Sequence, residues 1–283
     1  MKLANEGAEI WMPDGTAEAE ALARTTHMAI VAHQDDAEIV AYRGILECFG
    51  SDDRWFTAVV VTDGAGSSRT GPYADCTDEE MVQIRKREQR MAGMVGEYSA
   101  VAQLGYTSAQ LKQAGGSHLI GELADLLRAT RPEVLFTHNL ADKHDTHVGV
   151  ALRAIDACRA LDEGERPTRV LGGEVWRDLD WLCDADKVAL DVQERESLAL
   201  ALIGVFDSQI TGGKRYDLAT LGRRRAHATY HQSHESDAST ALSFAMDLTP
   251  LVKDRSIDVR AYTQGFVDRF AAEVSSRLSR LGG

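Results

Sequence analysis

Cysteine is scarce in this sequence, and its distribution excludes two common kinds of small-domain architecture. The 283 residues contain only four cysteines, and no two of them have CxxC spacing: Cys48, Cys76, Cys158 and Cys183. A disulfide framework and a cysteine-based zinc site are therefore not indicated. Each cysteine is expected to act as a small buried or half-buried apolar residue.

Long apolar runs and an excess of positive charge are also missing. No run of about 18 apolar residues exists, and the first residues lack the basic and apolar regions of a signal peptide. We therefore expect a cytoplasmic protein without a membrane anchor. The 31 basic and 44 acidic residues give a net charge of −13, which disfavours nucleic acids and anionic membranes as partners. A small-molecule substrate fits better.

The first half of the chain alternates short β-branched runs with longer helical patterns. Helices of this length between strands imply parallel pairing through right-handed crossovers, and hence a three-layer α/β/α sandwich with a Rossmann-like, mostly parallel sheet. The predicted strands are His27–His33, Trp55–Thr62, Ala100–Leu104, Glu133–His138, Val170–Trp176 and Lys187–Asp191. The predicted helices are Asp36–Phe49, Asp78–Tyr98, Ser117–Thr130, Thr146–Leu161 and Gln193–Phe206.

The last quarter of the chain gives a weaker signal. Turn-forming residues dominate 207–213 and 233–240, and 257–281 is typical of one or two closing helices. No internal repeat or long linker marks a second domain. We therefore expect residues 1–283 to form a single domain, with its core at about 27–206 and a C-terminal helical extension at about 207–283.

Histidines and carboxylates gather at one predicted rim. In open parallel sheets, ligands bind beyond the carboxyl ends of the strands. The first predicted strand ends at His33 and is followed by Asp35 and Asp36. The fourth ends at His138, and further histidines and aspartates follow it within ten residues: Asp142, His144, Asp145 and His147. Imidazole and carboxylate suit divalent zinc, and a catalytic zinc site uses three protein ligands and keeps one open position. Alternatively, Asp35 or Asp36 simply caps the next helix.

Two segments at this rim resemble motifs of a known family. Ala32-His-Gln-Asp-Asp-Ala-Glu38 is similar to the Ala-His-Pro-Asp-Asp-x-Glu motif of the LmbE-like (PIG-L) zinc-dependent N-acetyl deacetylases, and Asp142-Lys-His-Asp-Thr-His147 is similar to their Asp-x-His-x-x-His element. The resemblance extends over about residues 28–160. It implies a hydrolase that removes an acetyl group from the amide nitrogen of a small substrate, such as an N-acetylglucosamine-type conjugate.

The resemblance also implies roles for individual residues. His33, Asp36 and His147 would bind Zn²⁺ or another divalent transition metal, and Asp35 would be the general base for the attacking water. His144 would assist at the developing oxyanion. Arg85, in the element Arg85-x-x-Glu88, would reach the substrate; alternatively, Arg85 and Glu88 form an exposed i, i+3 ion pair.

The sequence departs from the family pattern at two places. Gln34 replaces the usual proline, so we expect hydrogen bonds to hold the loop in place of a rigid φ. Thr146 stands where many relatives carry an acid before the last histidine. Asp142 is therefore the residue expected to orient His144 or His147.

Other interpretations remain open at this point. A non-catalytic Rossmann-like metal- or nucleotide-binding module is the main alternative, although the glycine-rich segment 64–71 matches neither GxGxxG nor a P-loop. A structural metal site would be closed by a fourth ligand such as His138 or Asp142. The Arg223–His234 segment is expected to cover the rim and line the pocket; its three histidines at helical spacing are a weak candidate for a second metal site. The C-terminal amphipathic segment is a plausible contact in a homo-oligomer.

Overall fold

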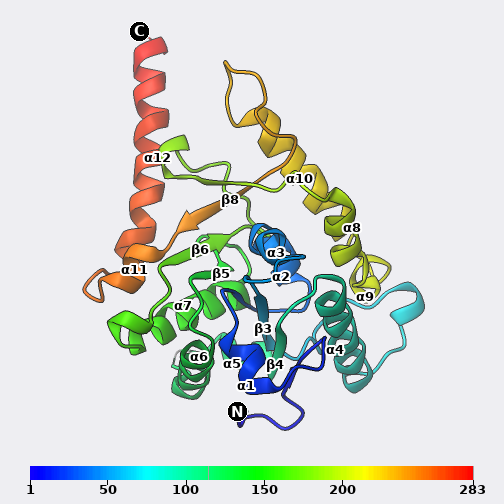
Figure 1. Cartoon of the computed structure of the whole chain (residues 1–283). Helices are drawn as coiled ribbons and strands as arrows, with labels where there is room; N and C mark the ends of the chain where they lie inside the picture. The colour runs from blue at the N-terminus through cyan, green and yellow to red at the C-terminus, as the bar shows by residue number, and fades with distance from the viewer. Residues whose placement is uncertain (114, 283) are drawn as a thin grey trace.

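The computed structural model shows one sheet covered by helices on both faces (Figure 1). The structure describes residues 1–113 and 115–282. No helix in these ranges is long and apolar enough to cross a membrane.

The strands are β1 (Glu9–Trp11), β2 (His27–Val31), β3 (Phe56–Thr62), β4 (Ala100–Tyr106), β5 (Val134–His138), β6 (Arg169–Gly173), β7 (Val188–Asp191) and β8 (Leu242–Asp247). The helices are α1 (Glu18–Ala23), α2 (Asp36–Val40), α3 (Tyr42–Cys48), α4 (Asp78–Val95), α5 (Ser108–Leu111), α6 (Ser117–Thr130), α7 (Asp145–Ala160), α8 (Glu196–Gly204), α9 (Asp207–Ile210), α10 (Tyr216–Tyr230), α11 (Thr249–Lys253) and α12 (Val259–Gly282).

The sheet has the order β1-β4-β3-β2-β5-β6-β8-β7. Strands β4, β3, β2, β5 and β6 are mutually parallel, while β1 pairs antiparallel with β4, and β8 lies antiparallel between β6 and β7. The expected α/β fold with a mostly parallel sheet is therefore confirmed. Residues after 206 add more than helices, because β8 is a strand of the same sheet.

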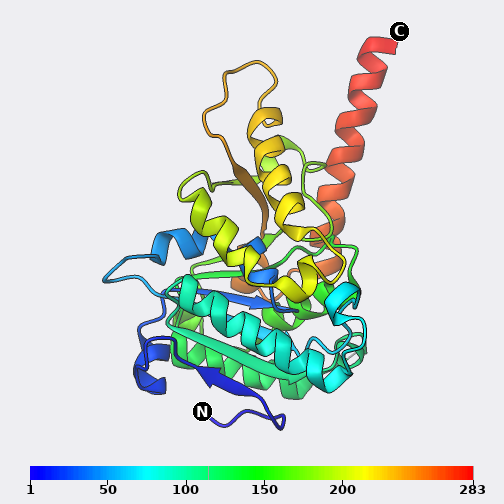
Figure 2. The same ribbon diagram turned by 90° about the vertical axis from the view of Figure 1, so that its right-hand side faces the viewer.

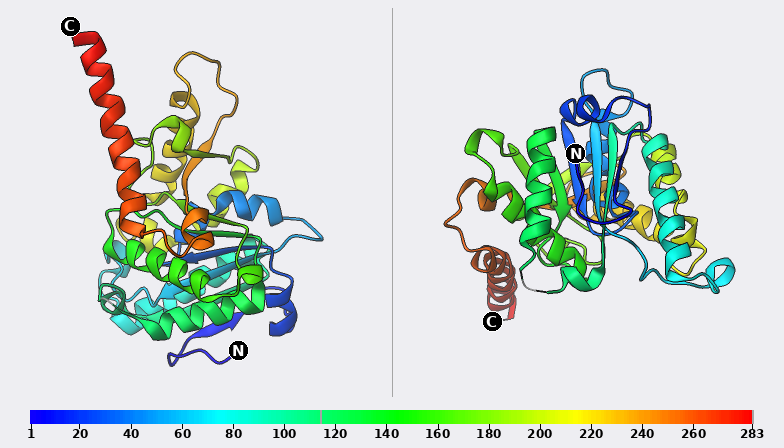
Figure 3. Two further views of the ribbon diagram at one scale, coloured as in Figure 1. Left: turned by 90° about the vertical axis from the view of Figure 1, so that its left-hand side faces the viewer. Right: turned by 90° about the horizontal axis from the view of Figure 1, so that it is seen from below.

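Two apolar clusters cover the two faces of the sheet, and β2 contributes to both. Met28 and Ile30 face the cluster with helices α6, α7 and α11, whereas Ala29 and Val31 face the cluster with α2, α3, α4 and α8. A strand buried on both faces needs a continuous apolar run rather than an alternating one, which is the pattern of residues 28–32. Figures 2 and 3 show these helical layers on either side of the strands.

Some predicted boundaries differ from the structure. The helix predicted at 36–49 is interrupted at Ala41, whose φ of −113° is not helical, and the strand predicted at 170–176 ends at Gly173. Strands β1 and β8 were not predicted. β1 has only three residues, and β8 has the sequence LSFAMD without β-branched residues, so neither carries a strong strand signal.

The connection order places the two motif-bearing segments side by side. The chain runs from β2 outward through β3 to β4 and then returns to the other side of β2 as β5. β2 and β5 are direct parallel neighbours, with His27 level with Val134 and Ala29 level with Phe136. The loops after β2 and β5 therefore lie next to each other at a topological switch point, where α/β sheets bind ligands.

Packing of α3 on the sheet depends on a glycine. A Cβ added to Gly44 would lie 2.5 Å from the Phe136 ring on β5, whereas a Cβ on the exposed Gly121 of α6 would meet no atom within 4 Å. We expect Gly44→Ala to lower the free energy of unfolding by about 1–3 kcal/mol through overpacking. The control Gly121→Ala should raise it by up to about 1 kcal/mol, because alanine favours a helix. Urea unfolding measures both, and equal effects would contradict this packing.

Candidate metal centre

The loop after β2 carries three functional side chains in an unusual backbone conformation. Asp35 has a φ of +87°, in the left-handed region that aspartate tolerates better than most residues. This turn lets α2 begin at once, with Asp36 as its first residue. Asp35 and Asp36 are both buried, so the simple capping alternative is not supported: neither Asp35 nor any other residue makes a side-chain cap bond at this helix start.

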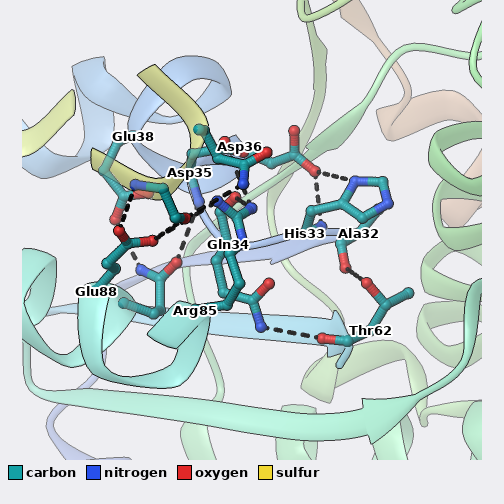
Figure 4. Close-up of polar contacts among 12 residues, drawn as sticks. Ala32, His33, Gln34, Asp35, Asp36, Glu38, Thr62, Arg85 and Glu88 are labelled. Atoms are coloured by element: carbon teal, nitrogen blue, oxygen red, sulfur yellow. Dashed lines mark hydrogen bonds and ion pairs between the residues drawn. The ribbon is translucent and has the colours of Figure 1, made fainter. Parts of the chain in front are cut away.

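Hydrogen bonds from α4 hold this loop, as Figure 4 shows. The Arg85 guanidinium donates to the backbone carbonyl of Gln34 and lies 3.5 Å from Asp35 Oδ2. Gln89 Oε1 accepts from the Asp35 N–H at 3.3 Å, and Gln89 Nε2 donates to the buried Glu38 at 2.9 Å. The strained turn is therefore fixed by side chains of a neighbouring helix.

Gln34 acts as expected from its replacement of the family's proline. Its side-chain amide donates to the Thr62 carbonyl at the end of β3, at 3.2 Å, and lies 3.4 Å from Gln103 Oε1 on β4. Hydrogen bonds to two neighbouring strands thus take the place of a rigid ring.

The loops after β2 and β5 bring three possible ligand atoms together. His33 Nδ1 lies 3.2 Å from Asp36 Oδ2 and 3.2 Å from His147 Nε2, and the last two atoms are 3.5 Å apart. Four ligands placed tetrahedrally at about 2.1 Å from zinc would be separated by about 3.4 Å. The three atoms therefore have the spacing of three corners of a zinc site, and their chemistry suits the ion.

His138 lies beside this triangle, but its near nitrogen is already in use. His138 Nε2 is 3.5 Å from Asp36 Oδ2 and accepts a hydrogen bond from the Ala32 N–H at 2.9 Å. A nitrogen that accepts a hydrogen bond has no lone pair left for a metal. Burial lowers the pKa of His138 well below its usual value, in keeping with this neutral accepting form.

Asp142 orients the last histidine of the triangle. Asp142 Oδ2 lies 3.4 Å from His147 Nδ1 and accepts from the Trp176 N–H, while Oδ1 accepts from the His144 N–H. The His147 ring is stacked between the rings of His138 and His144, with centroids 4.0 and 4.5 Å away. Both carboxylate oxygens of Asp142 are therefore occupied, which leaves Asp142 as an orienting group.

Two residues of the triangle, His33 and Asp36, line a cavity of about 340 Å³, whereas His147 is fully buried. His33, Asp35, Asp36 and His144 line its floor, and Arg85 lines its wall. Neither His138 nor Asp142 lines the cavity, so neither would occupy a ligand position on this side. His144 could supply a further ligand, because its ring nitrogen lies within 4.8 Å of ring nitrogens of His33 and His147.

The ionisable groups at the floor influence one another. Burial raises the pKa of Asp35 to about 8, although the Arg85 charge acts in the opposite direction. Burial also disfavours the charged form of Asp36, but the neighbouring His147 and His138 outweigh it and hold the pKa of Asp36 far below its usual range. Burial, with His147 and His33 nearby, lowers the pKa of His144 to about 4.

Arg85 is not part of an exposed ion pair. Its side chain is buried, and it lies 3.9 Å from Glu88, which accepts from both the Ser208 N–H and the Ser208 hydroxyl. Arg85 Nε and Nη1 have no hydrogen-bond partner among the described residues. The guanidinium thus supports the loop and keeps two buried nitrogens without a partner.

Several cavity residues were not identified from the sequence. The glycine-rich loop after β3 contributes Gly64, Gly66, Ser67 and Ser68. The rest of the lining comes from Ile39, from Thr146 and from isolated residues that no motif marks: Ser108 and Lys112 at α5, and Val175, Trp176, Gln209, Lys214 and Tyr216 after β6. The proximity of the last five depends on the path of the chain after β6.

The expectation that Arg223–His234 lines the pocket is wrong, because its side chains pack elsewhere. Arg224 is buried and donates to the carbonyls of Glu38 and Ile39, and His227 lies 2.9 Å from Glu174 and stacks on Phe244. Within the described ranges, both side-chain groups with metal-binding spacing lie at the β2–β5 rim, so a second site at 227–234 is not supported.

Comparisons with known proteins agree with this architecture. The family model described as PIG-L, GlcNAc-PI de-N-acetylase, matches residues 28–158. No curated protein sequence matches the chain significantly. The N,N'-diacetylchitobiose deacetylase of Pyrococcus horikoshii has a similar structure, with a TM-score of 0.62, 14% identity and coverage of 84% of this chain and 89% of that one.

Two other solved structures extend the comparison. The antibiotic A40926 pseudoaglycone deacetylase Dbv21 has a TM-score of 0.57 at 15% identity, covering 79% of this chain and 97% of its own. The 4-carboxy-2-hydroxymuconate hydratase GalB of Pseudomonas putida KT2440 has a TM-score of 0.58 at 18% identity, covering 79% and 95%. At such identities the likeness shows the fold, which therefore serves more than one reaction.

The family match covers both motif-bearing loops and the strands that bring them together. The resemblance seen in the sequence is thereby confirmed: residues 28–158 match the PIG-L family model, and the α/β fold is similar to that of the solved deacetylases.

Proposed function

We propose that the protein is a metal-dependent hydrolase that removes an acetyl group from the nitrogen of a small N-acetylated substrate. One observation carries this proposal: His33, Asp36 and His147 present three ligand atoms 3.2–3.5 Å apart, and His33, Asp36 and the neighbouring Asp35 line a cavity. The family match and the deacetylases among the similar structures support it.

The donor set best suits zinc, held by His33 Nδ1, Asp36 Oδ2 and His147 Nε2. When bound there, zinc would polarise the amide carbonyl and lower the pKa of a water to about 7. Asp142 keeps the His147 ring in the orientation that points Nε2 at the site, through its contact with Nδ1.

Asp35 is the proposed general base and acid. It lines the cavity next to a ligand of the triangle without being part of it, and Arg85 and Gln89 fix its position. A bound metal ion would favour the ionised form of this buried group, and its carboxylate would then take the proton of the attacking water and return it to the leaving amine. His144, which lines the cavity, would donate an N–H to the developing oxyanion.

The walls of the cavity suit a polar, ring-containing substrate. Trp176 and Tyr216 meet edge to face, with centroids 6.2 Å apart, and Ser67 and Ser68 add hydroxyl groups. Aromatic faces and hydroxyls together are typical of sugar-binding sites, since a sugar presents both C–H faces and hydroxyls. An N-acetylated amino sugar conjugate is the proposed substrate class.

Acetate release from N-acetylated amino sugars tests this function directly. The zinc-loaded protein should release free acetate, and a chelator that strips the metal should abolish the release until zinc is restored. The structurally similar hydratase makes hydration of a double bond the discriminating alternative. Tight zinc binding with hydration but no acetate would contradict the deacetylase proposal, and zinc binding with neither reaction would favour a non-catalytic module.

Separate variants distinguish metal binding from proton transfer. Asparagine also tolerates the positive φ at this position, so the Asp35→Asn protein should still bind zinc. Its turnover should fall by about 10²–10⁴, because the general base is lost. His147→Ala should lose zinc, because it removes one corner of the triangle. Metal content by mass spectrometry together with turnover decides the matter, and loss of zinc from the asparagine variant would show that Asp35 is a ligand.

The cavity walls also carry positive charge. Arg85, Lys112 and Lys214 line them, and Lys214 Nζ lies 5.1 Å from the centroid of the Trp176 ring. Both lysines are exposed, and they place positive charge at the cavity of a chain whose net charge is −13. This local charge supports a substrate that bears a carboxylate or phosphate beyond its acetylated nitrogen.

Lys214→Ala should raise KM for an acidic substrate by about tenfold, because it removes one charge-assisted hydrogen bond. The value of kcat should change little. KM for the matching neutral substrate should stay the same. N-acetylglucosamine and its 6-phosphate form a suitable pair, and Lys253→Ala, an exposed change outside the cavity, is the control. An equal effect on both sugars would contradict recognition of the acidic group.

A further inference from the structure

The C-terminal helix α12 leaves the body of the protein and continues without support. Its first part is anchored: Phe266 is buried, the Tyr262 hydroxyl donates to the Asp247 carbonyl at 2.7 Å, and Arg269 pairs with Asp186. Every residue from Val267 to Gly282 is exposed, and the helix projects away from the sheet in Figures 1 and 3. Short isolated helices are marginal in water, so this segment calls for a partner.

The exposed part of α12 carries a narrow apolar stripe. Five large apolar side chains are exposed there, by 37–75% of their surface: Val267, Phe270, Val274, Leu278 and Leu281. At about 100° per residue they fall within a sector of about 80°. A stripe of this width, repeated every three or four residues, is the seam through which two helices pack.

The spacing of the stripe is symmetric about its central residue. Relative to Val274, Phe270 and Leu278 stand four residues before and after, and Val267 and Leu281 stand seven before and after. Two identical helices that run antiparallel and cross at Val274 therefore place Phe270 against Leu278 and Val267 against Leu281. Such self-complementarity is what a two-fold contact between identical chains requires.

The charges beside the stripe fit the same pairing. Glu273 and Arg277 lie on one flank of the stripe and form an i, i+4 ion pair at 2.6 Å. A two-fold axis perpendicular to the helices brings like flanks together, and Glu273 of one copy then lies two residue steps from both Glu273 and Arg277 of the other. The ion pair within each helix therefore keeps this flank neutral where the two copies meet.

We propose that α12 is the interface between two copies of this chain, packed antiparallel about Val274. The pairing buries the apolar stripe and supports the part of α12 beyond Phe270, which the body of the protein does not contact. It uses no residue of the metal centre. It is independent of the proposed reaction, and its tests need no activity.

Sedimentation equilibrium of the full chain should show a reversible dimer. Val274→Asp places two carboxylates on the two-fold axis and should raise the dissociation constant by at least about 100-fold. Ser276→Asp adds the same charge on the opposite face of the helix and should leave the dimer intact. Circular dichroism checks that both variants keep their fold. A monomer at all concentrations, or a dimer insensitive to Val274→Asp, would overturn the proposal.

Disulfide cross-linking tests the antiparallel direction. In a background with Cys76 and Cys183 changed to serine, mixing Val267→Cys with Leu281→Cys chains should give the mixed disulfide dimer on oxidation. Cross-links of Val267→Cys chains to one another, without the mixed product, would show a parallel pair and rule out this register.

Discussion

The adjacency of β2 and β5 is the constraint on which the rest of this structure depends. Each strand ends in a loop of titratable side chains, and the parallel register sets the two loops side by side. As a result, residues more than a hundred positions apart, His33 and His147, have nitrogens 3.2 Å apart. Two imidazoles and a carboxylate this close and this buried need a cation between them, or a shared proton, to be stable.

The surrounding residues serve to keep that arrangement rigid. Arg85 and Gln89 on α4 hold the positive-φ turn at Asp35, and Asp142 with the stacked rings of His138 and His144 fixes His147. Preorganisation of this kind matters for catalysis, because a misplaced base or ligand loses most of its effect. The buried, strained loop is thus explained by the site rather than by the stability of the fold.

The sequence predicted the parts of the molecule that local pattern determines. β2, β3, β5 and their crossover helices follow from apolar runs and helical periodicity, and the two histidine-aspartate segments were placed at one rim by topology alone. Spacing alone could not show that His33 and Asp36 have atoms free for a metal whereas His138 does not. The Ala32 N–H that occupies His138 Nε2 is a tertiary contact. Lys214 and Trp176 could not be predicted either, because they are isolated residues that the path of the chain after β6 brings to the cavity. Strand β8 was missed because it joins the sheet without a strand-like composition.

The account is tested most directly by locating the metal itself. In crystals grown with zinc, an anomalous difference map at the zinc absorption edge should show one strong peak equidistant from His33 Nδ1, Asp36 Oδ2 and His147 Nε2, at about 2.0–2.2 Å from each. No peak between these three atoms, or a peak bound by other side chains of the chain, would contradict it.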